Sequence, residues 1–71
     1  MALQKFELEY DDYIELNNLL KATGWVDSGG LAKSLIGEGQ VKVGGQVELR
    51  KRCKIYRGMV VEFMGEQVEV V

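Results

Sequence analysis

The sequence predicts one small α+β domain, in which two short helices pack on a small, mainly antiparallel sheet of short strands. Three observations support this fold class. The chain has 71 residues, the size of a single domain with a modest core. Apolar residues recur at helical spacing in the first half of the chain and alternate with polar residues elsewhere. No proline, repeat or linker-like stretch interrupts the chain, so residues 1–71 are expected to form one unit.

The N-terminal strand is expected within residues 1–11. Phe6, Leu8 and Tyr10 alternate with charged residues, which is typical of a strand with one buried face. Two helices, the turn between them and the first hairpin strand are then expected in residues 12–45, and short strands in residues 46–71.

The first helix is expected to begin at Asp12, because Glu15 three residues later completes a capping-box pattern. The i, i+3, i+4 spacing of a buried helical stripe follows in Leu16, Leu19 and Leu20. Gly24 can end this helix.

The second helix is expected to begin at Asp27 or Ser28, either of which can cap it, and to reach about Gly37. Its apolar stripe comprises Leu31, Ala32, Leu35 and Ile36. At 100° per residue another face, expected opposite this stripe, comprises Gly29, Gly30, Lys33 and Gly37. A face without side chains lets another backbone approach closely, and the helix N-terminus could receive a phosphate. The other interpretation is that these glycines are merely tolerated.

Glycine turns separate the remaining strands. Residues 41–43 alternate and precede Gly44-Gly45, a strong hairpin signal. Two further strands are expected over residues 59–63 and 67–71, each preceded by a glycine turn.

Positive charge is concentrated in the middle of a chain whose formal net charge is −2. Residues 1–32 carry two cationic and six acidic side chains, residues 33–58 carry seven and two, and residues 59–71 carry none and three. Five of the nine cations lie in the stretch Val47–Gly58, VELRKRCKIYRG. This division favours a local basic patch over a uniformly charged surface.

If that stretch is extended, alternation places Arg50, Arg52 and Lys54 on one side, about 6.6–6.8 Å apart at each step. The opposite parity, expected to face the core, comprises Leu49, Cys53 and Ile55. Lys51 interrupts the alternation, so a bulge or loop is expected near it. A charged edge strand that resists aggregation would also explain the pattern. Three adjacent like charges repel one another, which favours a surface for an anion.

One cysteine and no histidine exclude most catalytic and metal-binding arrangements. Cys53 cannot form an internal disulfide, which fits a reducing compartment such as the cytoplasm. Ser-His and Cys-His nucleophile pairs and His-containing zinc sites are impossible. We therefore expect no catalytic residues, metal or cofactor. No apolar run approaches the roughly 18 residues of a membrane span, so no membrane association is expected.

Residues 28–45, SGGLAKSLIGEGQVKVGG, resemble the signature of a small RNA-binding domain named after ribosomal small-subunit protein four, the S-four domain. Its pattern is Ser-Arg-x-x-Ala, then Ile, Gly, Val-x-Val and Asn-Gly. Seven positions are in register: Ser28, Ala32, Ile36, Gly39, Val41, Val43 and Gly45. The preceding ELNNLLKATG resembles the first helix of the family and RGMVVEF its closing strand. The chain length and RKRCKI are similar to the stand-alone YbcJ-like members.

The resemblance implies an alpha-L motif, in which the two helices and the following hairpin form a basic surface for structured RNA. Carried over by position, the implied RNA-binding residues are Lys33, Lys42, Arg50, Lys51, Arg52 and Lys54. The family arginine after the serine is replaced by Gly29, and two further positions that are often basic hold Gly37 and Gln40. Charge is therefore concentrated on residues 50–54.

The expected function is that of a small, monomeric, non-enzymatic protein of the cytoplasm that contacts the phosphate backbone of structured RNA, such as ribosomal or transfer RNA. Gly29 and Gly30 would allow close approach, and Arg57 would assist. The alternative is a protein-interaction adaptor that docks an acidic partner on the same basic surface, by electrostatics or strand addition.

Overall fold

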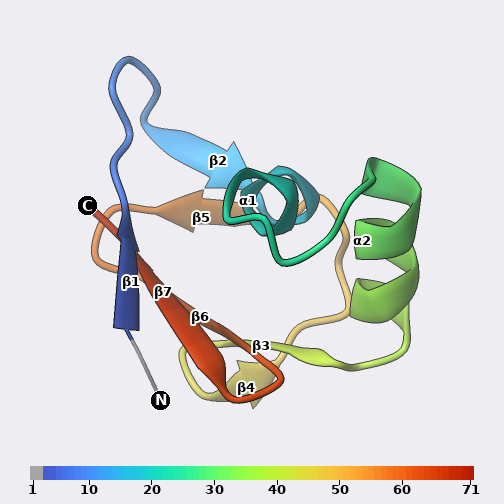
Figure 1. The fold of residues 1–71 in the computed structure, drawn as a ribbon. Helices are drawn as coiled ribbons and strands as arrows, with labels where there is room; N and C mark the ends of the chain where they lie inside the picture. Colours follow the sequence, from blue (N-terminus) through green and yellow to red (C-terminus); the bar gives the residue numbers. More distant parts are fainter. Residues whose placement is uncertain (1–2) are drawn as a thin grey trace.

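Two sheets and two helices make up the computed structural model, which describes residues 3–71 (Figure 1). The elements are, in chain order, β1 (Leu3–Phe6), β2 (Tyr13–Glu15), α1 (Leu16–Ala22), α2 (Gly29–Gly37), β3 (Val41–Val43), β4 (Gln46–Val47), β5 (Lys54–Tyr56), β6 (Val60–Phe63) and β7 (Glu66–Val70). The first two residues of the expected N-terminal strand lie outside the described residues.

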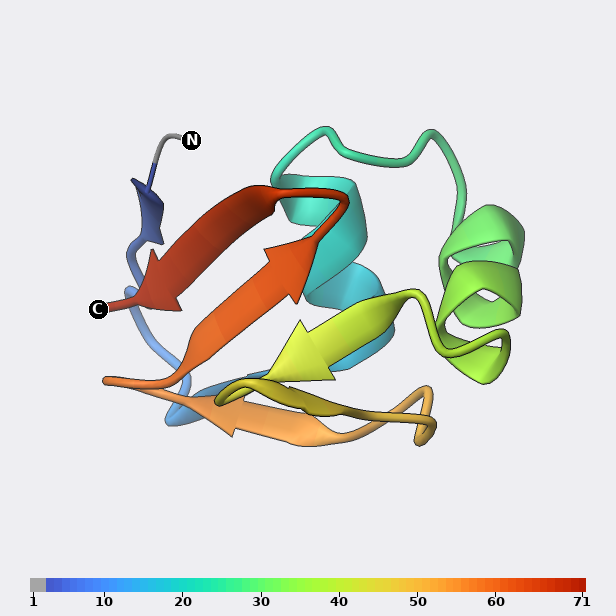
Figure 2. The ribbon, with the colours of Figure 1, turned by 90° about the horizontal axis from the view of Figure 1, so that it is seen from below.

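The larger sheet has five strands in the order β1-β7-β6-β3-β4, and the smaller one pairs β2 with β5. All pairings are antiparallel except that of β1 with β7, which is parallel. Figure 2 shows α1 behind the larger sheet and α2 beside it, near the start of β3. The expected fold class, two helices on a mainly antiparallel sheet of short strands, is confirmed.

The core lies between α1 and one face of the larger sheet. Leu16, Leu19 and Leu20 are completely buried, as their spacing predicts, and they belong to one cluster with Val41, Val61 and Val68. Each such aliphatic side chain contributes about 1.5–3 kcal/mol when it leaves water. The leucine stripe therefore fixes α1 on one face of the sheet, called the inner face, and the opposite face is called the outer face.

The predicted start of α1 at Asp12 is wrong. Residues 13–15 form β2, and Glu15 is the extended N-cap residue without a side-chain capping bond. The first N–H groups of the helix instead find carbonyl groups far along the chain: Leu16 donates to Cys53 at 2.9 Å and Asn17 donates to Lys51 at 3.1 Å. The pairing of β2 with β5 overrides the local capping pattern, because it brings residues 51–53 to the N-terminal end of α1.

The second helix begins and ends where the sequence predicts. The Ser28 hydroxyl accepts a hydrogen bond from the N–H of Leu31 at 3.1 Å and so caps the helix. Ala32 and Ile36 are buried, whereas Leu31, expected in the same stripe, is 46% exposed. Neither α1 nor α2 is long and apolar enough to cross a membrane, and they are the helices of residues 3–71.

The N-terminal strand is shorter than the alternation predicts. It ends at Phe6, and residues 7–12 form a loop, here called the acidic loop, in which Leu8 is buried but Tyr10 is 94% exposed. The reason is the partner strand: β1 pairs with β7, which ends at Val70. The hairpin is as predicted, because Gly44 and Gly45 have φ of 60° and 86° between β3 and β4.

Candidate functional site

Arg50, Lys51 and Arg52 of the basic stretch lie in a loop and not in a strand, whereas Lys54 lies in β5. Residues 48–53, the basic loop, connect β4 to β5 with a turn at Lys51-Arg52. The predicted extended row is therefore wrong, and Leu49, expected in the core, is 58% exposed. The loop leaves the edge of one sheet to reach the other and turns two carbonyl groups toward α1 on its way. The interruption expected near Lys51 is confirmed.

Two of the loop cations are held by carboxylates. Arg50 donates from Nε to Glu48 Oε2 at 2.9 Å and from Nη2 to Oε1 at 3.2 Å, and its backbone N–H also reaches Oε2 at 2.9 Å. These hydrogen bonds lower the pKa of the Glu48 carboxyl to about 2 and raise that of Arg50. Arg52 Nε lies 3.5 Å from Glu15 Oε1. Both arginine side chains are 78% exposed, so they remain accessible to a ligand.

Cys53, the residue after Arg52, has a packing role. Its side chain packs against the core cluster, and burial raises the pKa of its thiol above the ordinary value. A protonated thiol is a poor nucleophile, which agrees with its interpretation as a small hydrophobic residue.

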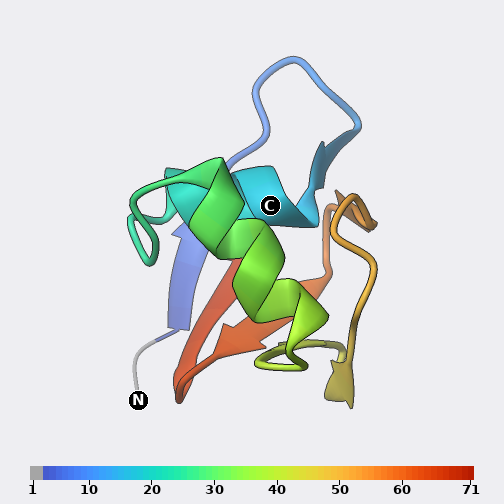
Figure 3. The ribbon, with the colours of Figure 1, turned by 90° about the vertical axis from the view of Figure 1, so that its right-hand side faces the viewer.

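Three lysines line one face of α2. A Cβ atom added to Gly37 would lie 3.6 Å from the Cε atom of Lys51. A Cβ atom added to Gly29 would lie 3.8 Å from the Cδ atom of Lys21. Lys33 is exposed and stands one turn from each glycine. We call Lys21, Lys33 and Lys51 the lysine ridge. Figure 3 shows α2 in front, with the basic loop beside its C-terminal half.

The glycines of this face do not all leave the same space. At Gly29 and Gly37 the neighbouring group is a lysine of the same chain at ordinary van der Waals distance, so a methyl group would fit. Nothing lies within 4 Å of the position of an added Cβ at Gly30. Among these three glycines, Gly30 therefore offers the open backbone that a close approach requires.

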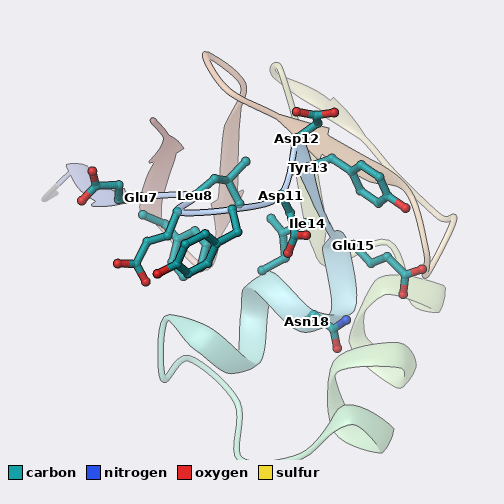
Figure 4. A pocket seen from close by; sticks show the side chains of 11 residues that line it. Glu7, Leu8, Asp11, Asp12, Tyr13, Ile14, Glu15 and Asn18 are labelled. Carbon is teal, nitrogen blue, oxygen red and sulfur yellow. The ribbon is translucent and has the colours of Figure 1, made fainter.

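The outer face of the smaller sheet carries two aromatic rings and two charges. Tyr13 is opposite Tyr56 in the strand register, and Glu15 is opposite Lys54. Figure 4 shows Tyr13 and Glu15 on one side of β2 and Ile14 on the other. We call the outward set, Tyr13, Glu15, Lys54 and Tyr56, the tyrosine face. A cavity of about 450 Å³ adjoins it and is lined by Arg50, Arg52, Cys53, Lys54 and Tyr56.

Lys42 and Arg57 stand apart from these cations. In β3, Val41 is buried and Lys42 is exposed, so Lys42 lies on the outer face of the larger sheet, opposite Glu62 in register. Arg57 Nη2 donates to the carbonyl of Leu8 at 2.8 Å, which ties it to the acidic loop. The structure thus groups Lys33 with Lys51, and Arg50 with Arg52 and Lys54, and it does not add Lys42 to either group.

A second cavity, of about 680 Å³, is surrounded by negative charge (Figure 4). Its lining includes five carboxylates, Glu7, Glu9, Asp11, Asp12 and Glu15. Within residues 3–71 no group of three or more potential ligands is arranged to hold a metal ion. The acidic loop repels anions, and Glu15, which also pairs with Arg52, marks where the acidic lining borders the basic loop.

The expected site did not include Lys21 or Tyr56. Lys21 precedes the interhelical turn, and only the approach of α1 to α2 brings it beside Gly29. Tyr56 shares the outward parity of Lys54, a signal that could have identified it from the sequence.

Comparison with known proteins gives consistent results. The pattern of the S4 domain family matches residues 6–71. YbcJ of Escherichia coli (strain K12) is 54% identical over 66 residues, which cover 93% of this chain and 94% of that protein, and YbcJ of Shigella flexneri gives the same values. The solution structure of YbcJ from E. coli matches with a TM-score of 0.75 and 51% identity over 100% of this chain and 90% of that one. That protein is described as having an αL motif involved in RNA binding.

Proposed function

The chain belongs to the S4 domain family, and on this basis we propose that it binds structured RNA through contacts of its cationic side chains with the phosphate backbone. We further propose that it does so as a monomer in the cytoplasm, without catalysis. The observation that carries the proposal is the continuity of two cationic groups. The lysine ridge ends at Lys51, the next residue is Arg52, and Lys54 follows on β5.

The contacts that we propose as principal are those of Lys33, Lys51, Arg52 and Lys54. Each of these side chains is exposed. Arg50 would contribute when a phosphate competes with Glu48 for its guanidinium group, and Lys42 would reach only RNA that extends around the sheet. Gly29 and Gly30 would let the backbone of α2 approach the RNA, with Gly30 the more open of the two.

Phosphate contacts position a protein on RNA without reading bases, so specificity in this mode comes from RNA shape. If about four phosphates are neutralised, the logarithm of the affinity should fall with the logarithm of salt concentration with a slope near −3 to −4. The acidic loop would orient the protein, because it turns away from the phosphates that the cations attract.

The experiment that tests this function compares a double variant with a charge-matched control by filter binding to a folded RNA, such as a transfer RNA. Lys51→Gln/Arg52→Gln should lose affinity about tenfold or more and should flatten the salt slope by up to about 2. The control, Lys5→Glu, lowers the net charge by the same amount on β1 and should bind nearly as the parent does. Equal affinity of the double variant and the control would contradict the proposed surface.

The alternative function is an adaptor that docks an acidic protein partner by electrostatic attraction to the same basic surface. Binding of a partner strand along residues 50–54 is disfavoured, because most of that segment is a loop. Weak binding of every folded RNA, together with salt-sensitive binding of an acidic peptide, would favour the adaptor.

A further inference from the structure

The tyrosine face combines an exposed aromatic ring with the ammonium group of Lys54, and Arg52 lies beside its Glu15. Tyr13 and Tyr56 have ring centroids 5.7 Å apart and planes inclined by 49°, so they do not stack face to face. Tyr56 remains 47% exposed beside this neighbour. The residue is therefore accessible to a ligand.

The charges around this ring are held in place by the same face. Lys54 Nζ lies 5.0 Å from the centre of the Tyr13 ring, which is cation–π distance. Arg52 lies within 3.5 Å of Glu15, the cross-strand partner of Lys54. The adjoining cavity of about 450 Å³ is within the range of small-molecule sites, roughly 300–1,000 Å³. Aromatic surface, cations and a cavity thus occur together.

We infer that this cavity holds one unpaired nucleotide of the bound RNA, with its base stacked on Tyr56 and its phosphate beside Lys54 and Arg52. This inference rests on the proposed function and adds a second mode of recognition to it. Proteins that bind unpaired nucleotides combine a cationic groove with aromatic rings on which bases stack, because every base has a π-face. A base within a duplex is covered by its neighbours on both faces, so only a bulged or looped nucleotide can enter.

An acidic peptide would pair with the same cations but would gain little from Tyr56, because carboxylates avoid the negative face of an aromatic ring. The exposed ring therefore favours a nucleotide over a peptide. It also distinguishes this site from the lysine ridge, whose three residues are all lysines.

The test compares two RNA probes, a blunt duplex and the same duplex with a single bulged 2-aminopurine. The parent protein should prefer the bulged probe and quench its fluorescence. Tyr56→Leu should bind the bulged probe about fivefold to a hundredfold more weakly, the range expected for one lost stacking contact, and should bind the blunt duplex as before. Tyr56→Phe should retain both the preference and the quenching, because stacking needs the ring and not the hydroxyl group.

Tyr10→Leu is the matched control, since Tyr10 is 94% exposed but lies on the acidic loop. It should leave both probes unaffected. A thermal unfolding curve for each variant checks that the fold is intact, and Tyr56→Phe provides the second variant if leucine disturbs β5.

Three results would overturn the inference. Equal quenching and equal binding of the bulged probe by Tyr56→Leu and the parent would remove Tyr56 from the site. A loss of the same size on both probes would mean that Tyr56 only positions the cations. Both results leave the proposed function standing, whereas failure of the parent to bind either probe would overturn the proposed function as well.

Discussion

The carbonyl group of Lys51 accepts a hydrogen bond from the N–H of Asn17 at 3.1 Å. This bond joins the basic loop to the first turn of α1, although the two residues are far apart in sequence. The backbone of the loop is thereby held against a helix whose leucines are completely buried, while its cationic side chains remain exposed. We therefore expect the charges of the proposed interface to be largely preorganised before RNA binds, which limits the entropy lost on binding.

Glu48→Gln is expected to increase RNA affinity. The substitution removes the carboxylate that holds both Nε and Nη2 of Arg50, so the guanidinium group becomes free to contact a phosphate. One additional phosphate contact should steepen the salt slope by up to about 0.9. The measurement is a salt titration of RNA binding. Glu66→Gln changes net charge equally at the start of β7 and serves as the control; a matching gain in that variant would contradict the local explanation.

Acid should remove the stabilising contribution of Glu48 over a defined pH interval. Its pKa is about 2 in the folded protein against an ordinary value of 4.5, so the folded state favours the ionised carboxylate. The contribution is complete above pH 4.5 and is lost as the pH falls toward 2. In urea unfolding across this range, the difference in unfolding free energy between the parent and Glu48→Gln should shrink on acidification. A difference that stays constant with pH would be inconsistent with the ion pair.

Gly30→Ala should separate stability from binding. Alanine is favoured over glycine in a helix by about 0.5–1 kcal/mol, and nothing lies within 4 Å of the added methyl group, so stability should rise. If RNA approaches the backbone closely at this position, affinity should fall although no charge has changed. Denaturant unfolding and filter binding together measure the two effects. A more stable variant with undiminished affinity would restrict the interface to the cationic side chains.

The sequence predicts best those features that short-range chemistry decides. Ser28 caps α2 through a residue three positions away, and Gly44-Gly45 supplies the left-handed conformations of its own turn. The sequence predicts the wrong surroundings for Asp12 and Leu49, because distant partners decide them. The pairing of β2 with β5 converts the apparent capping box into a strand, and the connection between the two sheets exposes Leu49.

The candidate site follows the same division. Local composition identifies the cations of residues 50–54, but their neighbours depend on tertiary structure. The sequence around Arg52 does not predict its contact with Glu15, which is 37 residues away. The position of Lys21 beside Gly29 depends on how α1 packs against α2. Lys42 alternates with buried Val41 and half-buried Val43, yet only the packing of Val41 in one cluster with the leucines of α1 shows that Lys42 lies on the opposite face.

The parallel pairing of β1 with β7 has a consequence for synthesis of the protein. Leu3–Phe6 is synthesised 64 residues before its partner Glu66–Val70, as the register Leu3↔Gln67 shows. During translation the edge of β1 that pairs with β7 therefore has no partner strand while the helices and the inner strands are synthesised. Contacts between such distant residues slow folding. The five-stranded sheet, and the core to which Val68 and Val70 belong, cannot be complete until β7 has been synthesised.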